Sequence, residues 1–138
     1  MMPSLVAEYN ADSLIGTDAT TADNNFDRHH PLYKTFKNYS HIYKYHKALR
    51  RGVQVERFVE EGNGIYAMSR IDPDTNHEYL VAFNTATTEK EFTVAGTSKT
   101  YNSVWSNRPF SYLRTDLQGD LTVTVPALGF VIYTCINN

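Results

Sequence analysis

Two pairs of carboxylates are the first residues whose types and spacing could carry chemistry. Glu60 and Glu61 are adjacent, and Asp72 and Asp74 are separated by one residue. Hydrolysis by paired carboxylates needs one group as acid and the other as nucleophile or base, with an apolar pocket that raises the pKa of the acid. Both pairs stand among Gly, Asn and Pro residues typical of hairpin turns. We therefore expect solvated turn carboxylates and no catalytic residue.

Metal ligands and activated nucleophiles are also poorly represented. Asp72, Asp74 and Asn76 imitate the first three ligand positions of an EF-hand loop, but His77 stands where that loop requires Gly. The His-His pair at 29–30 has no Cys or third His at a metal-site spacing. No G-x-S-x-G segment offers a nucleophilic serine. The sequence predicts neither a metal nor a cofactor.

Aromatic side chains gather in one stretch near the C-terminal third of the chain. They are Tyr101, Trp105, Phe110 and Tyr112. Exposed aromatic faces stack on sugar rings, whereas Trp and Phe also serve core and interdomain packing. Both interpretations stay open, and we keep Tyr101, Trp105 and Tyr112 as candidate carbohydrate contacts.

Composition limits the class of protein. The 138 residues suffice for one small domain with an appendage, and 41% hydrophobic and 13% aromatic residues can form a core. A formal net charge of −2 argues against nucleic acid as a partner, and no apolar run is long enough for a membrane span. The single Cys135 excludes an internal disulfide. The first residues lack a signal-peptide pattern, and any signal of a parent protein would lie upstream, so the compartment stays unknown.

The elements that must position these residues begin with one helix. Residues 1–29 have turn chemistry without a sustained period, which predicts an irregular arm. Pro31 opens a helix over residues 31–51, and Gly52 is placed to cap it. Basic residues in the last turns favour the negative end of the helix dipole. Apolar residues recur at three- and four-residue steps to form a stripe. The stripe consists of Leu32, Phe36, Tyr39, Tyr43, His46 and Leu49.

After Gly52 the hydrophobic period changes to two. Short alternating runs separated by Gly, Pro and Asn predict an antiparallel β-sandwich of the Greek-key type, with about seven or eight strands. The fold class is therefore mainly β, preceded by one α-helix and the irregular arm. The expected strands cover residues 53–57, 65–71, 79–83, 91–95, 101–105, 121–125 and 130–135.

The order of several short motifs resembles glycoside hydrolase family 13, the α-amylase family, over most of residues 15–135. The helix start and exit are similar to the last barrel helix of that family and its passage into the C-terminal domain, except that Val53 intervenes before Gln54. Residues 66–70 with 79–84 resemble a hairpin of that domain, and 121–129 resemble its closing strands. Residues 15–18 and 23–26 are similar to the loop after the last barrel strand. The helix motifs are His-Pro-Leu-Tyr-Lys at 30–34, Ala-Leu-Arg-Arg-Gly at 48–52 and Val-Gln-Val-Glu-Arg at 53–57.

The resemblance implies two segments and a supporting role. Residues 1–52 would be a remnant of a catalytic barrel, and residues 53–138 a C-terminal β-sandwich that stabilises that barrel in an enzyme acting on α-glucans. The family's catalytic carboxylates lie on earlier barrel strands, so none is carried over to this chain. The alternative is a starch-binding module. The expected partners are the barrel and, for the module, α-glucan. The exposed helix face is a candidate dimer contact, since apolar patches drive association.

Overall fold

The computed structural model describes residues 27–105 and 112–135. The chain forms two units, Met1–His41 and Ile42–Asn138. Within the described residues, no helix combines the length and the apolar character that crossing a membrane requires. Of the first unit, the described part is a turn at residues 27–30 and the first turns of a helix. The predicted boundary at residue 52 therefore falls within the second unit. The division into a barrel remnant and a C-terminal domain stays a prediction.

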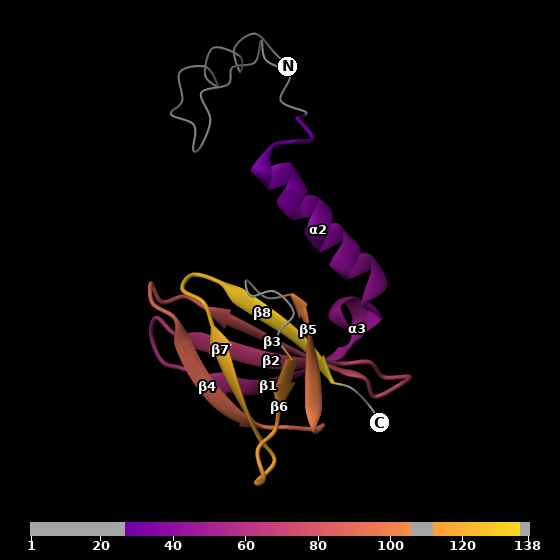
Figure 1. Ribbon diagram of the computed structural model, residues 1–138. Helices are drawn as coiled ribbons and strands as arrows, with labels where there is room; N and C mark the ends of the chain where they lie inside the picture. Colours follow the sequence, from indigo (N-terminus) through magenta and orange to yellow (C-terminus); the bar gives the residue numbers. More distant parts are fainter. Residues whose placement is uncertain (1–26, 106–111, 136–138) are drawn as a thin grey trace. The chain divides into compact units, whose positions relative to one another are not determined.

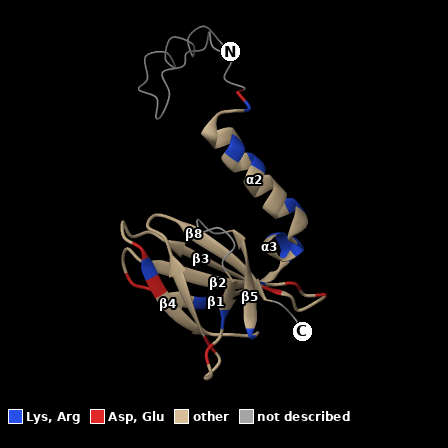
Figure 2. Cartoon of the chain, viewed as in Figure 1, with Lys and Arg blue, Asp and Glu red and all other residues tan. Residues whose placement is uncertain are grey.

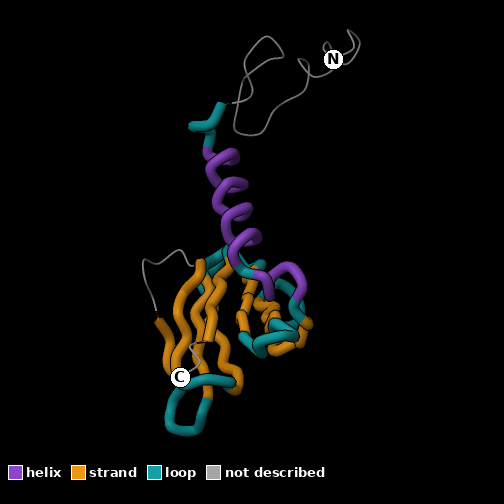
Figure 3. Tube along the Cα trace, turned by 90° about the vertical axis from the view of Figure 1, so that its right-hand side faces the viewer, coloured by secondary structure: helices purple, strands orange, loops and turns teal. Residues whose placement is uncertain are grey.

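The second unit is an antiparallel β-sandwich, which confirms the predicted fold class (Figure 1). A six-stranded sheet has the order β1-β2-β3-β8-β5-β6, and a two-stranded sheet pairs β4 with β7. Strand β8 returns from the end of the chain to lie between β3 and β5. Figure 3 shows the loops that join the strand ends. The strands are β1 Val53–Val59, β2 Ile65–Ile71, β3 Glu78–Asn84, β4 Lys90–Ala95, β5 Thr100–Trp105, β6 Tyr112–Arg114, β7 Asp120–Val125 and β8 Phe130–Cys135.

The single predicted helix is two helices, α2 Pro31–Tyr45 and α3 Lys47–Arg51. The break falls at His46, whose φ of −111° and ψ of 88° are not helical. Its ring lies edge-on against the ring of Tyr79 in β3, with centroids 5.3 Å apart. Arg50 of α3 donates to the carbonyls of Tyr43 and Lys44, which satisfies acceptors left free where α2 ends. A contact with the sheet therefore accompanies the break that periodicity did not predict.

Gly52 caps α3, as predicted, but its backbone is extended and not left-handed. Its N–H donates to the carbonyl oxygen of Ala48 over 2.7 Å. A Cβ at this position would lie 2.4 Å from that oxygen and 2.9 Å from the carbonyl oxygen of Ile71. Glycine is required here because the helix end and β2 approach the backbone closely.

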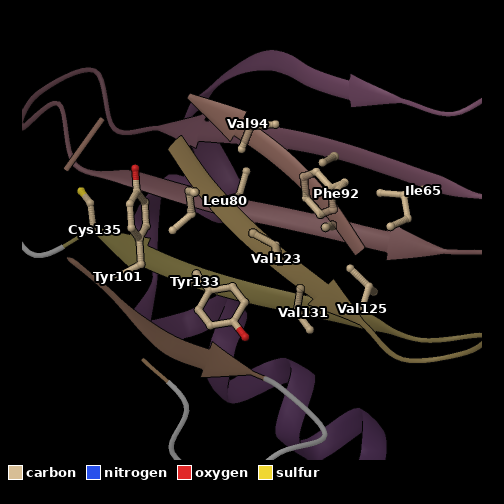
Figure 4. Close-up of a cluster of buried hydrophobic side chains, with 13 residues drawn as sticks. Ile65, Leu80, Phe92, Val94, Tyr101, Val123, Val125, Val131, Tyr133 and Cys135 are labelled. Atoms are coloured by element: carbon tan, nitrogen blue, oxygen red, sulfur yellow. The ribbon is translucent and has the colours of Figure 1, made fainter. Parts of the chain in front are cut away.

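The core lies between the inner faces of the two sheets. Figure 4 shows Phe92 and Val94 of β4 and Val123 and Val125 of β7 packed against side chains of β2, β3, β5 and β8. This burial of apolar area is the main stabilising term of the fold. The core cluster consists of Ile65, Ala67, Leu80, Ala82, Phe92, Val94, Tyr101, Leu121, Val123, Val125, Val131, Tyr133 and Cys135.

One end of the core is closed by the carboxylate of Glu78, the first residue of β3. Only 4% of this side chain is exposed, and Arg57 Nη1 lies 2.6 Å from it. Ser69 and Thr97 donate hydroxyl hydrogen bonds to the carboxylate, and the Tyr101 hydroxyl lies 3.4 Å away. Arg57 also donates to the carbonyl of Ala95 at the end of β4. Donors from β1, β2 and the segment after β4 therefore meet at one buried carboxylate.

The position of Arg57 depends on an irregularity in β1. Glu56 pairs with Met68 and Phe58 with Ala67, so Arg57 has no partner in the register. Such a β-bulge redirects a side chain out of the regular alternation. Here it allows Arg57 to reach the inner end of β3, where the guanidinium neutralises Glu78.

The opposite end of β3 is closed by Asn84, which is 3% exposed. Its amide nitrogen lies within hydrogen-bond distance of the carbonyl oxygens of Thr88, Val125 and Pro126. Its side-chain oxygen accepts from the N–H of Ala86. The Asn84 side chain thereby supplies hydrogen bonds to backbone groups in the segments that follow β3 and β7.

Removal of one partner of the Arg57–Glu78 pair will destabilise the sandwich strongly. Arg57→Met leaves a buried carboxylate without its cation, and Glu78→Gln leaves the guanidinium without its anion. Each change should lower the free energy of unfolding by about 3–5 kcal/mol, the usual cost of an orphaned buried charge. Urea denaturation followed by circular dichroism measures this loss.

The control is Arg114→Met, because Arg114 is exposed and its guanidinium lies over the ring of Tyr112. This variant should stay within about 0.5 kcal/mol of the wild type. The double variant Arg57→Met/Glu78→Gln should lose less than the sum of the two single changes. Strictly additive losses would show that the two side chains do not act as a pair.

Candidate functional site

Three of the four carboxylates considered for catalysis, Glu60, Asp72 and Asp74, lie close to a lysine. Glu60 forms an ion pair with Lys90, and its second oxygen accepts from the N–H of Ile65 over 3.1 Å. The hydrogen bond from Lys90, followed by the one from Ile65, lowers the pKa of Glu60. A general acid needs the opposite shift, since it must keep its proton near neutral pH. Glu60 is therefore built to stay ionised.

Asp72 and Asp74 belong to the turn between β2 and β3, and both face Lys47 of α3. Lys47 forms an ion pair with Asp74 and lies 3.8 Å from Asp72. The hydrogen bond from Lys47 lowers the pKa of the Asp74 carboxyl. Asp72 also accepts from the N–H of Asp74 over 2.9 Å, a contact typical of a turn. Across residues 27–105 and 112–135, no three His, Cys, Asp or Glu side chains are grouped to hold a metal ion.

The outer face of the six-stranded sheet carries an apolar surface, of which only Trp105 was among the candidates from the sequence. Cross-strand pairing brings Val59, Tyr66, Phe83 and Phe130 side by side on β1, β2, β3 and β8. Trp105 of β5 stacks on Phe130, with ring centroids 5.9 Å apart and an interplanar angle of 4°. We call these five residues the outer aromatic patch.

The outer aromatic patch is accessible to solvent in this chain. Val59 is 54% exposed and Phe83 39%, and the other three residues are half-buried. Beside it, Val81 and Ile132 on the same face are buried. Contiguous exposed apolar surface of this kind marks an interaction site more often than chance does.

A β-bulge places two of the three candidate carbohydrate contacts, Tyr101 and Trp105, on opposite faces of β5. Tyr101 and Trp105 are four residues apart, a spacing that places both on one face of a regular strand. The register shifts between Ser103 and Trp105, so Tyr101 faces the core and Trp105 pairs with Ile132 on the outer face. Tyr101 is 1% exposed, and its hydroxyl accepts from the N–H of Thr97. Burial corrects the expectation for Tyr101, because its ring has no free face for a sugar.

The other two candidates share the outer face. Tyr112 of β6 pairs with Asn102 of β5 and is 61% exposed. The guanidinium of Arg114 lies 5.5 Å from the centre of the Tyr112 ring. Trp105 is half-buried against Phe130. Phe110 lies outside the described residues, as do residues 15–18 and 23–26 of the N-terminal resemblance.

A signal in the sequence could have found the outer aromatic patch. Strands β3 and β8 carry apolar residues at consecutive positions, Tyr-Leu-Val-Ala-Phe at 79–83 and Phe-Val-Ile-Tyr at 130–133. An unbroken apolar run is typical of a strand covered on both faces, whereas a one-sided strand alternates. These runs therefore indicate a second covering layer on the outer face.

The apolar stripe predicted for the helix is largely exposed. Leu32 is 58% exposed, Phe36 62%, Tyr39 38% and Tyr43 62%. None of the residues of α2 is buried. A helix with an uncovered apolar stripe lacks the packing that normally supplies most of its stability.

No protein-family model matches the chain. A curated relative, an α-amylase of Streptomyces lividans, is 37% identical over 134 residues, which are 96% of this chain and 14% of the relative. The chain thus spans only a small part of the length of that relative.

Solved structures with the same fold include an Anoxybacillus α-amylase, with a TM-score of 0.61 and 14% identity over 78% of this chain and 23% of that one. A cyclomaltodextrin glucanotransferase with a three-domain ABC distribution also has a TM-score of 0.61, with 20% identity over 84% of this chain and 24% of that one. At these identities the structural likeness establishes the fold alone.

The Glu60–Lys90 pair predicts a pH-dependent contribution to stability. Because the pKa of Glu60 is lowered in the folded state, its contribution is present above the unfolded value of about 4.3 and is lost as the pH falls through the folded pKa. Glu60→Gln should therefore lower the urea midpoint at neutral pH and should match the wild type at about pH 2. Glu61→Gln, the neighbouring exposed change, should leave the midpoint unaltered at both. A Glu60→Gln deficit that persists in acid would contradict the linkage.

Proposed function

Because the chain belongs to the α-amylase family of glycoside hydrolases, we propose that it is a non-catalytic C-terminal part that covers and stabilises a catalytic barrel of a parent enzyme acting on α-glucans. The observation that carries this proposal is the outer aromatic patch, an apolar surface on a sheet whose other face already forms the core. A sheet face of this composition gains stability from a covering layer, at roughly 25 cal/mol per Å² of apolar area removed from water.

The exposed stripe of α2 supports the same interpretation independently. Leu32, Phe36 and Tyr43 are each more than half exposed, and they recur at a helical spacing. Domain interfaces within one chain are of this mixed apolar and tyrosine-rich kind. In the absence of its barrel, the chain is expected to associate with itself through these apolar residues.

The state of the turn carboxylates favours a structural role of the chain over a catalytic one. Glu60 and Asp74 each form an ion pair with a lysine, and each has a lowered pKa. Glycoside hydrolysis requires one carboxyl group that stays protonated beside a second that is ionised. Two ionised turn carboxylates do not meet this requirement.

A segment exchange tests the supporting role. In the Streptomyces lividans α-amylase, the segment that aligns with this chain is deleted or is replaced by this chain. The replacement should restore the yield of soluble enzyme and lengthen the half-life of starch hydrolysis at elevated temperature. The deletion should shorten that half-life several-fold, because it exposes the apolar surface that the segment covered.

The matched variants of the exchange are Phe83→Thr with Val59→Thr on the outer face, and Thr93→Ser with Thr122→Ser on the exposed face of the two-stranded sheet. The first pair should shorten the half-life of the exchanged enzyme, and the second should not. Equal half-lives for the deletion and the replacement would overturn the proposal.

The alternative function is an α-glucan-binding module. The observation that favours it is the shared position of Trp105 and Tyr112 on the outer face, with Tyr112 well exposed. The affinity of such a surface for α-glucan would come from stacking of sugar rings on aromatic faces.

Affinity electrophoresis in gels with soluble starch distinguishes the two functions. A supporting domain predicts unchanged mobility of the wild type and of Trp105→Ala and Tyr112→Ala. A module predicts retardation of the wild type that both substitutions reduce. Tyr33→Ala removes an exposed tyrosine on α2 and is the control for non-specific adsorption to starch.

A further inference from the structure

A cluster of two histidines around one tyrosine holds α3 on the outer face of the sheet. His46 Nδ1 lies 3.0 Å from the Tyr79 hydroxyl, and the rings meet edge-on. The ring of His77 lies against another side of Tyr79, with centroids 5.2 Å apart, and its Nε2 lies 2.6 Å from Thr134 Oγ1. These contacts join the start of α3 to β3 and β8. None of these residues belongs to the outer aromatic patch, and only His46 belongs to the apolar stripe of the helix.

We propose that this cluster is a pH-sensitive clasp, closed while His46 is neutral and opened when acid charges it. The clasp does not depend on the proposed function, because its contacts lie within the second unit and need no catalytic barrel. Histidine is the side chain whose ordinary titration falls nearest this range of pH.

The hydrogen bond explains the first part of the effect. A neutral imidazole with its proton on Nε2 accepts the Tyr79 hydroxyl proton at Nδ1. Protonation fills that acceptor position and makes Nδ1 a donor, so the hydroxyl proton must turn away from His46. The side chain of Thr134 is the other hydrogen-bond partner of the Tyr79 hydroxyl, so the redirected proton competes with the contact between Thr134 and His77.

The charges around the cluster explain the second part. Lys47, Arg50 and Arg51 lie on α3, where Figure 2 shows a concentration of basic residues. Arg70 of β2 is the direct cross-strand neighbour of Tyr79. The carboxylates on this side are Asp72 and Asp74, and both already face Lys47. A proton added to His46 is therefore added on a side of the sheet that carries more positive than negative groups.

The remaining titratable neighbours are Tyr79 itself and the thiol of Cys135. Burial raises the pKa of Tyr79, so its hydroxyl keeps its proton across the relevant range. Burial, followed by the charge of His77, lowers the pKa of His46 below its ordinary 6.5. The contribution of His46 is thus complete above about pH 6.5 and is lost as the pH falls through its lowered pKa.

Amide hydrogen exchange of the full chain, followed by NMR, tests the clasp. The reporters are the amides of Leu49 and Gly52, which donate within α3 and its cap. Their protection factors, taken relative to amides of β2 and β3, should fall several-fold between about pH 7.5 and about pH 5. In the variant His46→Gln/His77→Gln this fall should disappear. His29→Gln, at an exposed position before α2, should retain it.

A second readout needs no change in stability. The pKa of His46, followed through its ring proton, should rise in His77→Gln because a like charge is removed. Relative protection of α3 that is equal at both pH values in the wild type would overturn the clasp. So would a fall in the double variant as large as that of the wild type.

Discussion

The buried carboxylate of Glu78 is the constraint to which the rest of the sandwich is arranged. It lies at the end of β3 where the two sheets meet, and an uncompensated charge there would be costly. The bulge in β1 brings Arg57 to it, and Ser69, Thr97 and Tyr101 supply further donors or close neighbours. Together with Asn84 at the other end, β3 has a polar–apolar–apolar–polar inner face that fixes the length and register of the core.

The outer face of the same sheet is only partly covered, because α3 lies against Tyr79 while Val59 and Phe83 stay exposed. Strands β3 and β8 lie in the middle of the six-stranded sheet and carry apolar residues on both faces. The two-stranded sheet covers only the inner face. The outer aromatic patch and the half-buried Trp105 are the result. The matched α-amylase is far longer than this chain, and the proposed function assigns the outer aromatic patch to a contact with the rest of such a parent enzyme.

Much of the fold could be predicted from the sequence, because alternation and turn residues mark strands wherever one face is solvated. The strand starts at Val53 and Ile65 follow this rule. The features that could not be predicted depend on contacts between distant residues. The break at His46 accompanies its contact with Tyr79, and the bulge after Ser103 places Trp105 on the face opposite Tyr101. The three-residue strand β6 is too short to show a period.

We infer that this chain supports catalysis without performing it. The most direct test is the release of reducing ends from a maltooligosaccharide by the purified chain, followed through successive chromatographic steps. The rate should equal that of the blank without protein, and it should not change in Glu60→Gln or Asp74→Asn. Turnover that stays proportional to the amount of chain through every step, and that a single carboxylate substitution abolishes, would contradict it.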